Sequence, residues 1–231
     1  MTGRLTKLGI VLAIFGLGFI VVSGYAFVKV QEGQRSLQAF NAAQNVKLTY
    51  NEEGQLVDRG DVAEGQAIMS LLTNDWGYAI TPGELNPNDP IVNTASEYMY
   101  EMATVSYHTL HGTQTVILDE DFTAPDGTVY TAGVPYEVPV DGRYYSELDR
   151  NNPIEAAIRN QAWSPLALSL IGELGVGTAT ASSLQMGLGV AAIAFGLGFT
   201  FIFMGAGLVW AVRPETAKVR ATQQSLAPTP A

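Results

Sequence analysis

The sequence predicts an integral membrane protein of the α+β class, in which two transmembrane helices flank one mixed extracytoplasmic domain. Three observations lead to this prediction: an apolar run near each end, a polar and acidic segment between them, and a turn-rich stretch inside that segment that favours short strands. We divide the chain into an N-terminal segment at 1–7, a first span at 8–28, the domain at 29–185, a second span at 186–212 and a disordered tail at 213–231.

The first apolar run, Leu8 to Val28, contains no charged residue over 21 positions. About 20 apolar residues suffice for a helix that crosses a bilayer. A cleaved signal peptide is the alternative, because Arg4 and Lys7 precede the run and small residues at 24–26 resemble a cleavage site. The run is longer than the usual apolar region of a signal peptide, about 7–15 residues, which favours an uncleaved anchor.

The second apolar run, Met186 to Val212, is also uncharged and covers 27 residues. This is more than one span needs, so the helix is expected to tilt or to protrude from the bilayer.

The distribution of charge predicts the orientation. The two tails together hold five basic residues and one acidic residue, whereas residues 29–185 hold seven basic and 21 acidic residues, a formal charge of −14. By the positive-inside rule, both termini face the cytoplasm and the domain lies outside the plasma membrane. A domain of this charge is not expected to bind nucleic acid, because phosphates attract the opposite sign.

Both apolar runs contain the sequence Phe-Gly-Leu-Gly-Phe, at 15–19 and again at 195–199. Glycine allows helix backbones to approach closely inside a membrane. The two copies lie at the same distance from the outer ends of their runs, so we expect the spans to meet there. If the spans instead diverge, these faces would accept helices of a partner. The helix-packing candidates are Gly16, Gly18, Gly196 and Gly198.

Helices are expected at four places between the spans. The first span continues outward as an amphipathic extension at 31–45, and helices follow at 62–73 and 91–110. Another begins at Asn152-Pro153. In the apolar stretch 163–174, Glu173 and the Gly/Thr/Ser-rich segment that comes next follow the apolar residues too closely for a span. Two alternatives remain: a helix near the membrane surface or one in the domain core.

Short strands are expected at 115–118, 128–130, 136–140 and 143–145. The turns Ala-Pro-Asp-Gly at 124–127 and Asp-Gly at 141–142 would connect them into an antiparallel β-meander.

Two histidines are the weak candidate for a metal site. His108 and His111 are three residues apart and share a helix face. Glu101 lies seven residues before His108, about two helical turns, which is too far to share an ion without a rearrangement. We therefore favour a solvated helix face and expect neither a metal nor a cofactor.

Other catalytic signatures are missing from the sequence. The chain has no cysteine, which excludes disulfides, thiolate nucleophiles and zinc–thiolate sites. The acidic run at 119–121 begins like a calcium loop, but Ala124 occupies the position that requires glycine. No Gly-x-Ser-x-Gly elbow occurs either. These absences favour a protein that is not an enzyme.

Aromatic residues gather in the first half of the domain. They are expected to form a contact surface or to line a ligand pocket, where such residues are enriched. The alternative is that they lie at the edge of the core as ordinary amphipathic residues. The residues concerned are Trp76, Tyr78, Tyr98, Tyr100 and Tyr107.

Two short motifs carry a family resemblance. These are Tyr-Ser-Glu-Leu-Asp-Arg at 145–150 followed by Asn-Asn-Pro, and Met-Gly-Leu-Gly-Val at 186–190, which opens the second span. With the overall layout, they resemble a group of uncharacterised actinobacterial two-span membrane proteins, some of which are labelled aromatic ring-opening dioxygenases. The resemblance implies this topology and an actinobacterial cell envelope. It implies no catalytic residues, and the dioxygenase label is not carried over because the sequence shows no convincing site of two histidines and one carboxylate.

Three functions follow as hypotheses. The first is a non-enzymatic accessory or scaffold subunit of a larger membrane assembly, with the lipid bilayer and other membrane subunits, or further copies of itself, as partners. The second is an extracytoplasmic ligand-binding or sensing module. The third is a metal-dependent envelope enzyme that uses His108 and His111.

Overall fold

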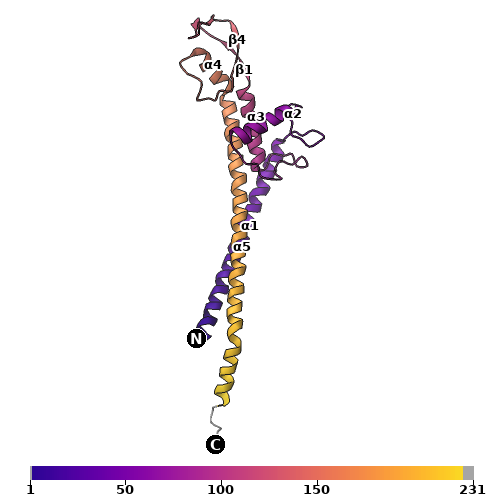
Figure 1. Ribbon diagram of the computed structural model, residues 1–231, viewed down its shortest axis with the longest axis vertical. Helices are drawn as coiled ribbons and strands as arrows, with labels where there is room; N and C mark the ends of the chain where they lie inside the picture. The colour runs from indigo at the N-terminus through magenta and orange to yellow at the C-terminus, as the bar shows by residue number, and fades with distance from the viewer. Residues whose placement is uncertain (1, 226–231) are drawn as a thin grey trace. The chain divides into compact units, whose positions relative to one another are not determined.

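The computed structural model describes residues 2–225, with side chains described for residues 3–212. The chain divides into two compact units. The first unit contains the chain up to Ser36 and from Ser183 onward, and the second contains Leu37–Ser182. Two long helices, α1 (Thr2–Gln44) and α5 (Pro165–Ser225), contribute residues to both units (Figure 1).

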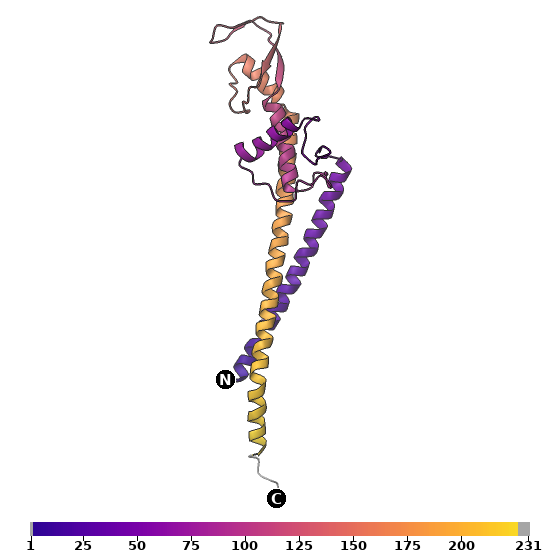
Figure 2. The ribbon, with the colours of Figure 1, turned by 45° about the vertical axis from the view of Figure 1, so that its right-hand side comes forward.

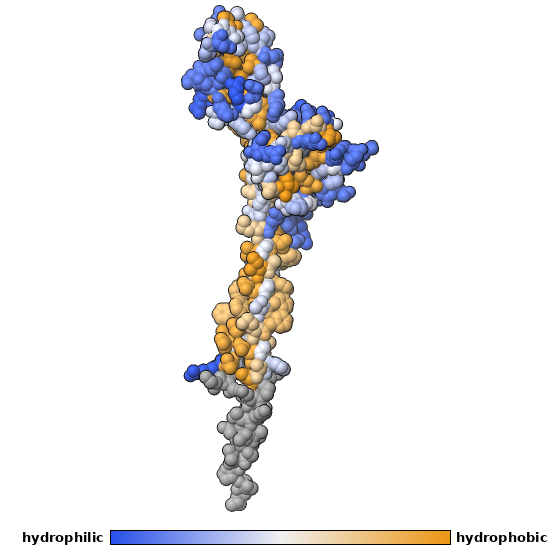
Figure 3. All heavy atoms as spheres, in the orientation of Figure 1, coloured by the Kyte–Doolittle hydropathy of each residue, from blue (hydrophilic) through white to orange (hydrophobic). Residues whose placement is uncertain are grey.

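Both long helices contain a segment that is long and apolar enough to cross a membrane, Gly3–Gln44 in α1 and Pro165–Val212 in α5. Only 11 % of the most apolar window of each segment is buried, whereas the core helix of a soluble protein hides its apolar side chains. Figure 3 shows mostly hydrophobic residues along the coloured part of the long helices, interrupted by a narrow strip of less hydrophobic ones. The prediction of two long apolar helices is confirmed.

The second long helix extends further than expected. Residues 213–225, which were expected to be disordered, continue α5 as helix. After Pro214 this stretch consists largely of residues with high helix propensity, including alanine, lysine, arginine and glutamine. The rest of the expected tail, 226–231, lies outside the described residues.

Within the first unit, α1 and α5 run antiparallel and meet through small residues (Figures 1 and 2). A Cβ atom built on Gly16 would lie 2.6 Å from the carbonyl oxygen of Gly198, and one on Gly198 would lie 2.9 Å from the carbonyl oxygen of Gly16. A second close approach joins Gly9 to Gly205. Only glycine permits these contacts, because the neighbouring atoms belong to backbone that cannot move aside.

The contacts between the two helices recur every seven residues. Seven residues after Gly16 along α1, the buried Ser23 hydroxyl donates a hydrogen bond of 2.7 Å to the carbonyl oxygen of Ala191, which lies seven residues before Gly198. The seven-residue spacing is that of a left-handed helix pair with one constant seam. It explains why Gly18 and Gly196 take no part: nothing among the described residues lies within 4 Å of a Cβ atom built on either. The expectation that all four glycines pack together is therefore half wrong.

The second unit holds the remaining helices, which are α2 (Val62–Ser70), the π-helix η1 (Leu71–Asp75), α3 (Ala95–Leu110) and α4 (Pro153–Ala162). The expected helix 91–110 starts four residues later than predicted, because the Thr94 side chain caps it. Thr94 accepts from the Glu97 backbone, and the Glu97 carboxylate accepts from the Thr94 backbone at 2.8 Å. This reciprocal capping box buries Glu97, which is 1 % exposed.

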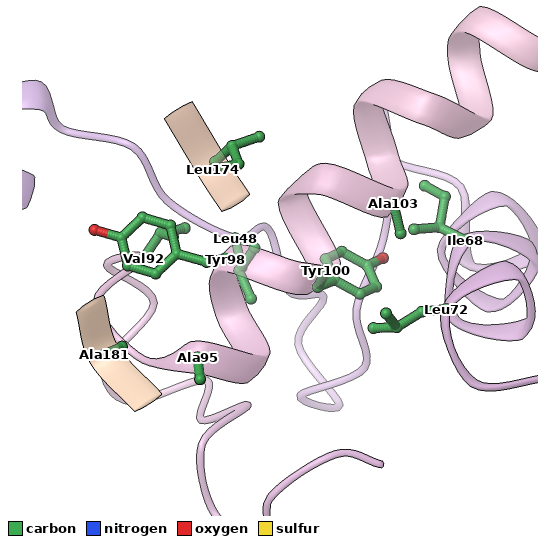
Figure 4. Close-up of a cluster of buried hydrophobic side chains, with 10 residues drawn as sticks. All are labelled: Leu48, Ile68, Leu72, Val92, Ala95, Tyr98, Tyr100, Ala103, Leu174 and Ala181. Atoms are coloured by element: carbon green, nitrogen blue, oxygen red, sulfur yellow. The ribbon is translucent and has the colours of Figure 1, made fainter. Parts of the chain in front are cut away.

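The core of the second unit surrounds α3. Figure 4 shows Tyr98 on one side of this helix, near Val92, Leu174 and Ala181, and Tyr100 on the other, near Ile68 and Leu72. All of these side chains are less than one-tenth exposed. Because Leu174 and Ala181 belong to α5, the start of this long helix forms part of the core.

The predicted β-meander is wrong in its connectivity. The strands are β1 (Thr113–Ile117), β2 (Phe122–Thr123), β3 (Val129–Tyr130) and β4 (Pro135–Pro139), and β1 pairs with β4 while β2 pairs with β3. The predicted turn at 124–127 closes the inner hairpin, with Gly127 N donating to Ala124 O at 2.9 Å. The outer strands β1 and β4 pair with each other in a separate two-stranded sheet.

The expected fourth strand at 143–145 does not form. Asp141 and Gly142 adopt positive φ angles of 59° and 70°, as a type I′ turn requires. Beyond the turn, however, side chains satisfy the backbone carbonyls: Trp163 Nε1 donates to Arg143 O at 3.1 Å, and Arg159 Nε to Tyr145 O at 3.0 Å. These bonds replace the hydrogen bonds of a strand pair.

The apolar stretch 163–174 is not a separate helix. Trp163 is buried at the end of α4, and α5 begins at Pro165 without a later break. Leu174 lies in the core, whereas Leu166 is 79 % exposed. The core alternative is therefore correct for Trp163 and Leu174, whereas Leu166 between them is exposed.

Candidate ligand-binding pocket

A pocket of about 520 Å³ opens in the second unit, where α1, α3 and the start of α5 come together. This volume lies within the range typical of small-molecule sites, about 300–1,000 Å³. All of its lining residues belong to the second unit. The apolar walls include Leu37, Phe40, Val92, Val105, Leu174 and Val176. We call it the α1/α3/α5 pocket.

Polar side chains interrupt these walls at a few points. They are Asn41 and Gln44 from α1, Tyr98 and Glu101 from α3, and Glu173 and Thr180 from α5. A largely apolar cavity with a few convergent polar groups is the usual form of a site that binds and orients a small molecule.

One polar atom of the buried Asn41 amide lacks a hydrogen-bond partner. The residue is 4 % exposed, and its Oδ1 accepts a hydrogen bond of 2.8 Å from the Tyr98 hydroxyl. Its buried Nδ2 has no hydrogen-bond partner among the described residues. A hydroxyl can donate or accept, so turning the amide over would keep the bond to Tyr98 and leave the oxygen free instead. In either orientation one buried polar atom is unsatisfied, at a cost of about 1–3 kcal/mol, unless a ligand or a water molecule supplies the partner.

The Tyr98 ring reaches Asn41 because α5 has a glycine at the point of contact. A Cβ atom built on Gly177 would overlap the ring of Tyr98. Burial raises the pKa of the Tyr98 hydroxyl, the bond to Asn41 opposes this, and nearby Glu173 adds to it. Glu173 therefore acts electrostatically on the Tyr98–Asn41 pair.

Glu101 is the second unusual polar group of the pocket. Burial, and to a smaller extent the negative charge of Asp58, raise the pKa of its carboxyl to about 7. Asp58 itself is paired with a histidine, because its Oδ2 lies 2.8 Å from His108 Nε2. A carboxyl group that changes charge near neutral pH beside a cavity is a common mark of a functional site.

The histidines do not converge as a metal site would require. His108 turns to Asp58, whereas His111 places its Nδ1 2.9 Å from the Tyr107 carbonyl oxygen and packs its ring against Tyr107. Among the described residues, no group of three His, Cys, Asp or Glu side chains is placed to hold a metal ion. A site built on His108 and His111 would need a rearrangement of both side chains.

The five aromatic candidates do not form one contact surface. Tyr98 and Tyr100 are 7 % and 3 % exposed and belong to the core, where their rings supply apolar area. Trp76, Tyr78 and Tyr107 are partly buried against the core. Trp76 Nε1 also donates to the Tyr144 hydroxyl at 2.9 Å. Of the five, Tyr98 alone lines the α1/α3/α5 pocket.

The residues that the sequence analysis missed are Asn41, Glu101 and Glu173 as members of one site. A partial signal existed in α1, where Leu37, Asn41 and Gln44 follow at helical spacing and place two amides on an apolar face. The meeting of this face with α3 and α5 depends on long-range packing, which helical periodicity does not encode.

Comparison of the chain with protein-family models, curated proteins and solved structures found no match. The resemblance to actinobacterial two-span proteins stays a prediction.

Proposed function

We propose that this protein is a non-enzymatic, two-span membrane protein that binds a small ligand in the α1/α3/α5 pocket on the extracytoplasmic side of the plasma membrane. The pocket is the observation that carries the proposal: its volume of about 520 Å³ suits a small molecule, and the buried Asn41 amide lacks a partner. The two exposed apolar helices support the membrane anchor, and the positive tails support the orientation.

Closing the pocket should remove the ligand. Val176 lines the pocket on α5 and is 67 % exposed, so Val176→Trp adds an indole at the opening without disturbing the core. Native mass spectrometry of the full chain, purified in mild detergent, should show a bound molecule in the wild type. We expect the bound fraction of Val176→Trp to fall by about tenfold, since the added ring excludes the ligand from its contacts.

The matched control is Leu166→Trp, which changes an exposed residue of the same helix outside the pocket. This variant should keep the adduct. A wild type without an adduct, or an adduct that survives equally in Val176→Trp, would contradict the proposal.

A second candidate function, an accessory subunit of a larger membrane assembly, rests on the two glycines that the helix pair leaves free. Gly18 and Gly196 have nothing among the described residues within 4 Å of a built Cβ atom, so another helix can approach each closely. If a partner docks there, the wild type in mild detergent should migrate as an assembly, and the Gly18→Leu/Gly196→Leu variant should migrate as a smaller species. A wild type that purifies as a clean monomer would count against this function.

A further inference from the structure

The charged groups that line the α1/α3/α5 pocket are all of one sign. Glu101 lies in its wall, partly buried, and Glu173 is exposed on α5. Among the described lining residues none is Lys, Arg or His. An anionic ligand would therefore meet two carboxylates without a compensating cation, whereas a cation would be attracted by both.

The free polar atom of Asn41 adds a hydrogen-bonding requirement to this charge. In the structure the Tyr98 hydroxyl donates to the amide oxygen and the nitrogen is unpaired; with the amide turned over, the hydroxyl would accept from the nitrogen and the oxygen would be left to accept from a ligand. A primary ammonium group has three N–H donors, so it can donate to this oxygen and to a carboxylate of the pocket wall at the same time. Hydrogen bonds between ionised partners are roughly twice as strong as neutral ones.

The apolar walls of the pocket favour a ligand with an apolar tail. Leu37, Phe40, Val105 and Leu174 offer no hydrogen bonds, so a fully hydrophilic cation would lose hydration along these walls without replacement. A bare metal ion fits poorly for the same reason, and two carboxylates are fewer ligands than a divalent cation usually takes from a protein site. The ligand that satisfies both parts of the pocket is amphiphilic.

We propose that the ligand of the α1/α3/α5 pocket is a cationic amphiphile, with an ammonium head at Glu101, Glu173 and Asn41 and an alkyl tail along the apolar walls. This inference rests on the proposed ligand-binding function and narrows it to one chemical class. The formal charge of −14 on residues 29–185 favours the approach of such a molecule to this part of the chain.

Three probes with the same alkyl chain test the charge of the head group. The full chain is reconstituted in phosphatidylcholine nanodiscs at pH 8 and titrated with decylamine, decanol or decanoate. Hydrogen exchange of α3 peptides reports occupancy of the pocket. We expect decylamine to give half-maximal protection at a concentration about tenfold or more below that of decanol, and decanoate to give none.

Matched variants tie this protection to the carboxylates. Glu101→Gln or Glu173→Gln should raise the concentration of decylamine that gives half-maximal protection about tenfold or more and leave that of decanol unchanged. Each substitution replaces a charged acceptor by a neutral amide of similar shape. Glu120→Gln, which changes an exposed carboxylate outside the pocket, should behave as the wild type. Uptake of the probes by the bilayer is common to all variants, so differences between variants report the pocket.

The outcomes separate this inference from the function on which it rests. If decanol or decanoate protects α3 as strongly as decylamine and Val176→Trp abolishes that protection, the cationic assignment is overturned and the pocket remains a binding site. If no probe gives protection that Val176→Trp abolishes, both the assignment and the proposed function fail.

Discussion

Replacing Gly16 with leucine is expected to separate α1 from α5 in the first unit. A Cβ atom at this position would lie 2.6 Å from Gly198 O and 2.9 Å from Ile202 N, both of which are backbone atoms. Backbone cannot rotate out of the way as a side chain can, so the whole helix has to shift. Overpacking typically costs about 1–3 kcal/mol, and we expect this substitution at the upper end or beyond because the seam is lost with it.

The separation can be measured as a distance between spin labels. The chain has no cysteine, so two introduced cysteines are labelled without competition. Val21 and Ile193 are 71 % and 67 % exposed and carry labels outside the seam. In lipid nanodiscs, Gly16→Leu should lengthen and broaden the distance distribution between these two sites.

Gly18→Leu is the control, two residues along the same helix. Nothing among the described residues lies within 4 Å of its built Cβ atom, so this substitution should leave the distance unchanged. Equal effects of Gly16→Leu and Gly18→Leu would show that the helices meet through another face.

Replacing Glu101 with glutamine is expected to stabilise the second unit at pH 8 and to leave it nearly unchanged at pH 5. The carboxyl has a pKa of about 7 in the folded state, against 4.5 as its ordinary value. The folded state thus holds this proton more tightly than the unfolded chain, and the resulting stability is lost as the pH rises from about 4.5 through 7. Between pH 5 and pH 8, ionisation of this carboxyl should lower the free energy of unfolding of the wild type by about 2–3 kcal/mol. The glutamine variant should show no such loss from this position.

Urea unfolding at pH 5, 6, 7 and 8, followed by the fluorescence of Trp76 and Trp163 in the second unit, measures the difference. Burial also raises the pKa of Glu97, and its contribution to the pH profile cancels when the two proteins are compared. Asp58 acts on Glu101 and is paired with His108, so Glu120→Gln is a safer control than any change to that pair. A difference between wild type and Glu101→Gln that stays constant over this pH range would contradict the burial of this carboxyl.

The first unit was largely readable from the sequence because a long uncharged apolar run is a strong, local signal for a long apolar helix. Uncharged runs at 8–28 and 186–212 predicted two long apolar helices, and these are present. The repeated pentapeptide identified the place where they meet. It did not tell Gly16 from Gly18, since residues two apart point to nearly opposite sides of a helix and only one of them can face the partner. The seven-residue spacing of small residues was the missing signal.

The second unit was less predictable because its features depend on contacts between distant segments. The turn at 124–127 was correct, yet strand partners cannot be read from turns, and the nested pairing replaced a meander. The pocket is the feature that the sequence predicts least. Asn41, Glu101 and Glu173 come from three helices, and none has a neighbour in sequence that would mark it as part of a site. The Thr94 cap, in contrast, was within reach, since a Thr and a Glu three residues apart are a sequence pattern.

The hydrogen bond between Ser23 and Ala191 limits how the two helices of the first unit can move. If α1 slid along α5 by one turn, the hydroxyl would leave its acceptor and the glycines would face larger side chains. If the pair spans a bilayer as proposed, no water is present there to replace the lost bond. The hydrogen bond and the close glycine contacts therefore oppose axial displacement of α1 along α5.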